Sequence, residues 1–234
     1  MNIWLTGDTH GKIDINKLSY ENWKESKNFK KDENILIILG DFGLLWKNIP
    51  DNEEKYWLKW LSNKPWITLF VDGNHENYFR LKQLKEIEMF GSKVGKVTDS
   101  IFHLRRGNIY CINNNYFFVM GGASSMDKQY RIEGLSWWKE ELPNYREMKY
   151  GLDNLKKYNN EVDYILSHTG PQSIINKIDG IPYIYPGDSL TKYFDNLKDN
   201  INFKRWYFGH MHENINIDSK YFCIFDNIQL LKEN

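Results

Sequence analysis

The sequence predicts an α/β fold with mixed sheets, and two features indicate it. Short apolar runs that are typical of buried strands alternate with stretches that begin like amphipathic helices. Further along, apolar runs follow one another closely, around Phe102 and at 109–112, 116–120 and 221–225, which favours an antiparallel portion. No repeat or Gly/Ser-rich linker divides the 234 residues, so we expect one domain over residues 1–234.

Five of the apolar runs share a second property, because each leads into a turn that carries Asp, Asn or His. The run at 3–5 is followed by Asp8 and His10, the run at 35–39 by Asp41, and the run at 67–71 by Asn74 and His75. The run at 164–166 is followed by His168, and the run at 206–208 by His210 and His212. In open α/β sheets the loops beyond the carboxyl ends of the strands gather at one edge, where ligands bind. We therefore expect the five turns to converge.

Three helices are predicted from their starts and their apolar spacing. Asp51 and Glu54 have the spacing of a capping box, and Asn144 and Glu147 have it again. A third helix is expected over 79–89. The apolar positions are Tyr56, Trp57, Trp60 and Leu61 in the first of these helices, Leu152 and Leu155 in the second, and Leu81, Leu84 and Ile87 in the third.

Composition and charge restrict the function. The 31 basic residues balance the 31 acidic ones, so no net field draws the chain onto nucleic acid or an anionic membrane, and a phosphate-bearing ligand would need a local site. The chain opens into an apolar run without a basic leader or a long apolar stretch, so we expect a cytoplasmic protein without a membrane segment. Cys111 and Cys223 lack zinc-finger spacing and are expected to be small buried hydrophobes.

The five turns offer carboxylate, amide and imidazole groups, a set that suits manganese, iron or zinc. Taken singly, each motif has a plainer explanation: Asp8 could cap a helix, and Asp41 could belong to an ordinary turn. Asn74 could lie in a left-handed turn, and His168 could be a core histidine. Gly-His-x-His points to a metal more directly, because alternate positions of an extended segment would aim both imidazoles the same way. Five of the six histidines lie on these turns, and His103, the sixth, is expected to be structural or exposed.

The ordered set Asp-x-His, Gly-Asp, Gly-Asn-His-Glu, a single His after a strand and Gly-His-x-His resembles the calcineurin-like metallophosphoesterase superfamily, from Asp8 to His212. The resemblance implies a four-layer α/β/β/α sandwich with two mixed sheets. It also implies a hydrolase that cleaves a phosphate mono- or diester of a small molecule or nucleotide with two divalent ions. Mn²⁺ is expected first, and Fe, Zn, Ni or Mg are alternatives.

The same resemblance implies a role for each motif residue. Asp8, His10 and His212 would hold one ion, Asn74, His168 and His210 would hold the other, and Asp41 would bridge both. Two such ions share a water, lower its pKa and neutralise charge on the phosphoryl oxygens, so the bridging carboxylate is also catalytic. His75 would be the catalytic residue that protonates the leaving oxygen, and Asn74 and His75 would contact the substrate.

One departure from the family pattern concerns the phosphate clamp. The protein serine/threonine phosphatase branch continues its Gly-Asp motif with Val-Asp-Arg-Gly, whereas this chain has no arginine over 40–46. The segment 121–128, which resembles uncharacterised bacterial and phage members, is followed by Arg131, and that residue could bind substrate phosphate instead. An ion pair between Asp127 and Arg131 is an equally good interpretation. Either Trp137 or Trp138 could stack a nucleobase or pack in the core.

Two other functions compete with a small-molecule phosphoesterase. A nucleic-acid or nucleotide phosphodiesterase, or an end phosphatase, would use local basic pairs such as 105–106 and 204–205. A scaffold that kept the fold and lost catalysis is the other alternative. Such proteins lose metal ligands or the acid, whereas every one of those positions is filled here.

Overall fold

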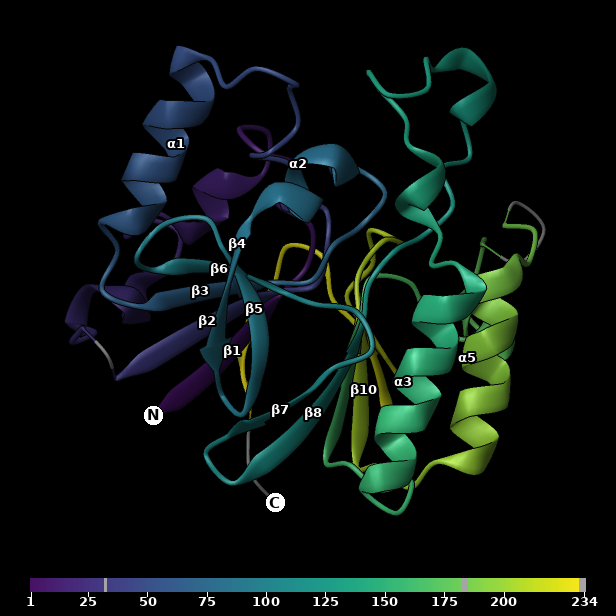
Figure 1. Ribbon diagram of the computed structural model, residues 1–234. Helices are drawn as coiled ribbons and strands as arrows, with labels where there is room; N and C mark the ends of the chain where they lie inside the picture. The colour runs from purple at the N-terminus through teal and green to yellow at the C-terminus, as the bar shows by residue number, and fades with distance from the viewer. Residues whose placement is uncertain (32, 182–184, 232–234) are drawn as a thin grey trace.

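The computed structural model describes residues 1–31, 33–181 and 185–231, and its two mixed sheets pack face to face with helices on both outer faces (Figure 1). The helices are α1 (Asn52–Ser62), α2 (Tyr78–Gln83), α3 (Tyr145–Lys157), α4 (Gln172–Ile175) and α5 (Ser189–Asn200), and short 3₁₀ helices lie at Ile15–Leu18, Lys24–Asn28, Lys128–Tyr130 and Lys139–Glu141. In Figure 1, α1 and α2 lie on one side of the paired sheets and α3 and α5 on the other. The four-layer α/β/β/α prediction is confirmed.

Both sheets have a parallel centre with antiparallel strands at their edges. The first sheet runs β13 (Ile228–Leu230), β1 (Asn2–Thr6), β2 (Asn34–Ile38), β3 (Ile67–Phe70), β6 (Ile101–Leu104), β5 (Ser92–Lys96) and β4 (Lys85–Met89). The second runs β11 (Ile215–Ile217), β12 (Tyr221–Cys223), β10 (Arg205–Phe208), β9 (Tyr164–Ser167), β8 (Asn115–Met120) and β7 (Ile109–Ile112). Strands β1, β2, β3 and β6 are mutually parallel, as are β12, β10, β9 and β8. Parallel neighbours end at the same edge of a sheet, so the turns that follow them are brought together.

The core between the sheets consists of strand side chains that point inward from both. Leu5, Ile37 and Leu69 of the first sheet pack in one cluster with Phe117 and Leu166 of the second. The outer faces are covered in the same way, by apolar residues of α1 and α2 on the first sheet and of α3 and α5 on the second. Because both faces of the central strands are buried, their sequences are continuous apolar runs rather than alternating ones.

The two predicted helix starts are confirmed, although one apolar face is narrower than expected. Asn144 and Glu147 form a complete capping box at the start of α3, and the Asp51 side chain accepts a hydrogen bond from the Glu54 N–H at the start of α1. Leu61 of α1 is fully buried, whereas Tyr56 is 60% exposed. Tyr56 therefore lies outside the face that packs on the first sheet.

The helix predicted over 79–89 is wrong beyond Gln83. Leu84 is extended, and 85–89 forms β4, which pairs antiparallel with β5 through a two-residue turn. Phe90 and Gly91 in this turn have φ of 54° and 77°, as a type I′ hairpin requires. Residues 84 and 87 fit a helical spacing, but Ile87 and Met89 also fit the period of a strand, and pairing with β5 decides between them.

Three further findings concern parts of the chain outside the expected elements. Helix α5, with a capping box formed by Asp188 and Thr191, was not predicted from the sequence. Cys223 is buried as expected, but Cys111 is exposed, and both are free thiols. Across the residues that the structure describes, no helix has both the length and the apolar character that a bilayer crossing requires.

The packing between the sheets generates a stability prediction. Leu166→Ala should lower the free energy of unfolding by about 2–5 kcal/mol, because Leu166 is fully buried between the sheets and the substitution leaves a cavity. Urea denaturation measures the change. The control is Leu135→Ala, at a position 55% exposed, which should change stability by less than about 0.5 kcal/mol. Equal effects of the two substitutions would contradict this description of the core.

Candidate metal centre

The five polar turns converge where the parallel strands of both sheets end. Strands β1, β2 and β3 of the first sheet and β9 and β10 of the second each lead directly into one of these turns. The residues brought together are Asp8, His10, Asp41, Asn74, His75, His168, His210 and His212, which is the full set predicted from the sequence. Backbone hydrogen bonds join the turns, because the N–H groups of Thr9 and His10 both donate to the Asp41 carbonyl.

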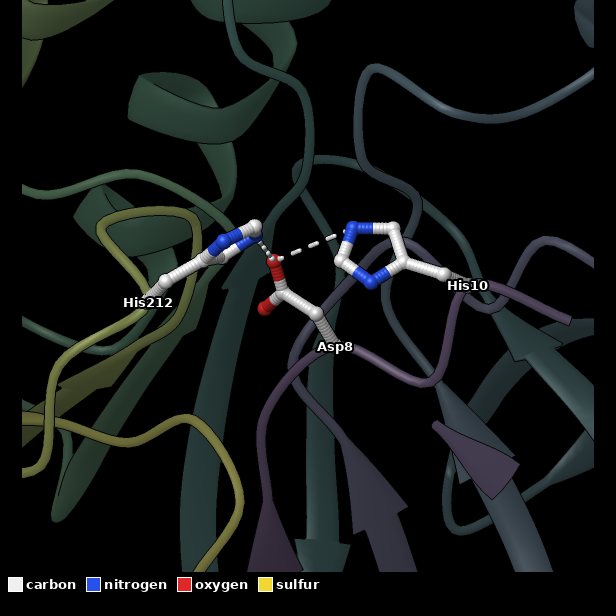
Figure 2. Close-up of side chains that lie close together, drawn as sticks. All are labelled: Asp8, His10 and His212. Atoms are coloured by element: carbon white, nitrogen blue, oxygen red, sulfur yellow. Dashed lines mark ion pairs between the residues drawn. The ribbon is translucent and has the colours of Figure 1, made fainter. Parts of the chain in front are cut away.

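Asp8, His10 and His212 form one side of the site (Figure 2). The Asp8 Oδ2 atom lies 3.2 Å from His212 Nε2 and 3.8 Å from His10 Nε2. The two rings are 5.0 Å apart, and the His212 ring also stacks on Phe225 at 4.5 Å. In Figure 2 the two imidazoles approach the carboxylate from opposite sides, so one oxygen and two nitrogens face a common point.

Asp41 lies between this group and a second one. Its Oδ2 atom is 3.3 Å from His10 Nε2, and its Oδ1 atom is 3.2 Å from His168 Nε2. His168 Nε2 is also 3.2 Å from Asn74 Oδ1, and the ring of His210 lies 4.9 Å from that of His168. One carboxylate therefore contacts both groups through its two different oxygens.

Hydrogen bonds behind the site determine which ring nitrogen faces it. His168 Nδ1 donates to the Leu39 carbonyl at 2.8 Å, and His10 Nδ1 lies 2.7 Å from Asp14 Oδ2. Both rings therefore present Nε2 to the centre, which is the arrangement found for metal-binding histidines. Neither partner was predicted. The only sequence signal for Asp14 is a carboxylate four residues after His10.

The backbone at the site is held in an unusual conformation. His10, Asp41, His210 and His212 have φ of 42°, 46°, 65° and 53°, in the left-handed region that costs non-glycine residues free energy. The prediction that His210 and His212 lie on an extended segment is therefore wrong. Their rings converge because the turn after β10 is left-handed at both positions. The strain persists because the surrounding turns are cross-linked by hydrogen bonds.

Two glycines allow the turns to approach each other. A Cβ on Gly40, which has a φ of +93°, would lie 2.1 Å from His168 Nδ1. A Cβ on Gly73 would lie 2.1 Å from Asp41 Oδ1. Real atoms do not approach so closely, so any side chain at either position would displace a residue of the site.

The electrostatics of the site are dominated by two buried carboxylates. Burial lowers the pKa of His168, but the charges of Asp41 and Asp8 outweigh this effect and raise that pKa to about 10. Burial also lowers the pKa of His10, whereas its hydrogen bond with Asp41 and the charges of both carboxylates raise it to about 8. Burial raises the pKa of Asp41, but the His168 charge together with the hydrogen bonds from His10 and His168 holds that pKa well below its usual range. Protons on two imidazoles thus compensate two carboxylates.

His210 has a different ionisation state. Burial and the neighbouring charge of His168 lower its pKa to about 3, so its ring is neutral at physiological pH. A neutral imidazole is the form that binds a metal ion.

The residues fit a metal centre. Asp8 Oδ2 is buried, and no described residue donates a hydrogen bond to it, which is unfavourable unless another group binds there. Three groups have ligand atoms within 4.8 Å of one another, namely Asp8, His10 and His212, then His10, Asp41 and His75, then Asp8, Asp41 and His168. Mixed oxygen and imidazole ligands of this kind suit manganese, iron or zinc.

The side of the site next to His75 carries the candidate substrate-binding groups. The Nη2 atom of Arg131 lies 3.5 Å from His75 Nε2, while its Nε atom is 2.7 Å from Asp127 Oδ1. The predicted ion pair between Asp127 and Arg131 is therefore present, and the guanidinium that it holds lies beside His75. The ring of Trp46 lies 5.6 Å from that of His75 and was not anticipated.

Two other predicted residues are structural. His103 is buried and lies 3.0 Å from Asp72 Oδ1, and Arg106 contacts the same carboxylate at 2.6 Å. Trp138 is 5% exposed and packs edge to face against Trp46, so it belongs to the core.

A comparison with protein families decides what this arrangement represents. The family model described as calcineurin-like phosphoesterase matches residues 1–214. The chain belongs to that family. It is a metal-dependent hydrolase of phosphate esters. Its clustered carboxylates and imidazoles are the residues that can hold metal. No curated protein matches the sequence.

Solved structures confirm the fold at low sequence identity. Phosphopantetheinyl hydrolase from Mycobacterium tuberculosis aligns with a TM-score of 0.51 and 11% identity, over 96% of this chain and 89% of its own. A Staphylococcus aureus protein provisionally assigned as a 5′-nucleotidase, in complex with alpha-ketoglutarate, aligns with a TM-score of 0.50 and 12% identity, over 100% of this chain and 51% of its own. These likenesses concern the fold alone.

The ionisation of the site predicts a proton-linked metal affinity. If His10 and His168 bind the ion, manganese binding at pH 7 should release about two protons, which these rings retain at their pKa values of about 8 and about 10. The apparent affinity should rise from pH 6 to pH 8 as competing protons become scarcer. Isothermal titration calorimetry in buffers of different ionisation enthalpy measures the release. Binding without proton release would contradict the charge assignment.

Proposed function

We propose that the chain hydrolyses a phosphate mono- or diester of a small molecule or nucleotide at a centre of two divalent ions, with Mn²⁺ as the first choice. The position of Asp41 carries the proposal. Its two oxygens face two different histidines, His10 at 3.3 Å and His168 at 3.2 Å, as a carboxylate shared by two ions would. A site for one ion would not require this second group of ligands.

The proposal divides the residues between the two ions. Asp8, His10 and His212 would hold one ion, Asn74, His168 and His210 would hold the other, and Asp41 would contact both. When bound, two divalent ions lower the pKa of a shared water and neutralise charge on the phosphoryl oxygens. The protein supplies rigid ligands, because hydrogen bonds from behind fix the rings of His10 and His168.

His75 is proposed as the group that protonates the leaving oxygen. Burial and the charge of Arg131 lower its pKa, although Asp41 acts in the opposite direction, so the free ring is neutral at pH 7. A phosphate group beside it adds negative charge and favours the imidazolium, so the acid forms when substrate is bound. Arg131 would bind the same phosphate, held by Asp127, and Asn74 and His75 would complete the contacts to it.

The surface charges favour a small substrate over nucleic acid. Lys204 lies 2.7 Å from Asp163, and Arg106 is buried against Asp72 at 2.6 Å. The basic pairs that would contact a nucleic-acid backbone are thus largely neutralised within the protein. A non-catalytic scaffold is not favoured either, since all eight site residues are present and converge.

A metal-dependent activity panel tests the proposal. It compares a chromogenic phosphate monoester, the matching diester, cyclic nucleotides and phosphorylated oligonucleotides, with Mn²⁺ or with a chelator. We expect Mn²⁺-dependent hydrolysis of a small-molecule arm, and Asp41→Asn should lower kcat/KM by about 100-fold or more because both ions lose a shared ligand. Asp153→Asn, at an exposed carboxylate on α3, is the matched control and should keep full activity. Full activity of Asp41→Asn would contradict the shared-carboxylate assignment, and metal-independent hydrolysis would contradict the whole proposal.

The substitution His75→Asn tests whether His75 is the proton donor or a metal ligand. Loss of a positioned proton donor should lower kcat by about 10²–10⁴-fold while metal content stays unchanged. Mass spectrometry of bound metal, measured beside turnover, checks both parts. His75 lies within ligand distance of His10 and Asp41, so loss of an ion together with activity would make it a ligand instead.

A further inference from the structure

The segment 121–141, which joins β8 to α3, contains contacts that the proposed function does not use. It begins at the carboxyl end of β8, beside the strand ends that carry the site, and its proposed role so far belongs to Arg131 and the ion-pair partner Asp127. Ser125 and Glu141 of this segment are 3% and 2% exposed. Polar side chains buried to this extent need hydrogen-bond partners, and theirs lead to a proposed metal ligand.

Glu141 determines the direction of the Ser125 hydroxyl. The Ser125 Oγ–H donates to Glu141 Oε2 at 2.7 Å, and the Ser125 backbone N–H donates to Glu141 Oε1 at 3.0 Å. A carboxylate offers only acceptors, so the one hydroxyl proton of Ser125 is committed to Glu141. The Ser125 oxygen can therefore only accept from its remaining neighbour.

That neighbour is the side-chain amide of Asn74. Its Nδ2 donates to Ser125 Oγ at 3.3 Å, and its Oδ1 atom consequently points the other way, to within 3.2 Å of His168 Nε2. An amide has nearly the same shape after a half-turn, so packing alone does not distinguish its oxygen from its nitrogen. The bond to Ser125 favours the nitrogen on one side, the Nε2 proton of His168 favours the oxygen on the other side in the metal-free protein, and only the oxygen can bind a cation.

We propose that Ser125 and Glu141 are positioning residues that hold the Asn74 amide with its oxygen toward the ion shared with His168 and His210. The inference rests on the proposed function, because it assigns Asn74 to that ion. Groups that orient metal ligands typically change metal affinity by about 10–100-fold when they are removed. The effect should be confined to one ion, because the side-chain contacts of Ser125 and Glu141 in the described part of the chain lead to Asn74 and not to Asp8, His10 or His212.

The structure provides a substitution that isolates this role. Glu141 also closes the loop that carries Arg131, through its bond with the Ser125 backbone N–H. Ser125→Ala removes only the hydroxyl and keeps that backbone bond, so the loop remains closed. Glu141→Gln alters both features at once. Ser124→Ala changes the adjacent, half-buried serine and is the matched control.

The test is titration with Mn²⁺ alone by isothermal calorimetry, with thermal unfolding of the metal-free proteins beside it. The parent chain should bind two ions. In Ser125→Ala the affinity for one ion should fall by about 10–100-fold and the affinity for the other should stay unchanged, with Ser124→Ala like the parent. Adding Glu141→Gln to Ser125→Ala should cause no further loss of metal affinity, because both act through the same amide.

A second variant distinguishes amide orientation from general support. In an Asn74→Asp background the two side-chain oxygens are equivalent, so Ser125→Ala should no longer weaken either ion. If the parent binds two ions and Ser125→Ala binds both with the same affinities as the parent, the positioning role alone is overturned. Equal weakening of both ions, or the same loss in the Asn74→Asp background, would show structural support and would also overturn it. A parent that binds no manganese would overturn the proposed function and this inference together.

Discussion

Two carboxylates buried side by side are the constraint on which the rest of this site depends. Asp8 and Asp41 lie at the ends of adjacent strands with almost no exposure to water, and burying uncompensated charge is very costly. In the metal-free protein, protons on His10 and His168 provide the compensation, because the charges of the two carboxylates raise the pKa of both rings. Divalent ions would provide it more effectively, so the same arrangement that strains the metal-free fold favours metal binding.

The architecture determines where this charge can gather. Each sheet has a parallel centre, so the turns after β1, β2 and β3 and those after β9 and β10 meet along one line. Glycines let the turns approach within atomic contact, and left-handed residues aim the side chains inward. The packed layers on both sides hold these turns rigidly, which is what a catalytic metal centre requires of its scaffold.

The sequence predicted much of this arrangement because the informative residues are local. A run such as 35–39 followed by Asp41, or 206–208 followed by two histidines, identifies a strand and its ligand turn together. The features that were missed depend on contacts between distant segments. Strand β4 was expected to be helical because its pairing with β5 is not encoded in its own spacing, and the Asn74–Ser125–Glu141 chain joins residues up to 67 positions apart. Left-handed His210 and His212 were missed because an extended segment accounts for the same motif.

The proposed function depends on two ions that share Asp41, and anomalous diffraction from crystals soaked in Mn²⁺ tests this most directly. The prediction is two manganese peaks, with Asp8, His10 and His212 around one, Asn74, His168 and His210 around the other, and the Asp41 carboxylate between them. A single peak, or two peaks with Asp41 bound to neither or to only one, would contradict it.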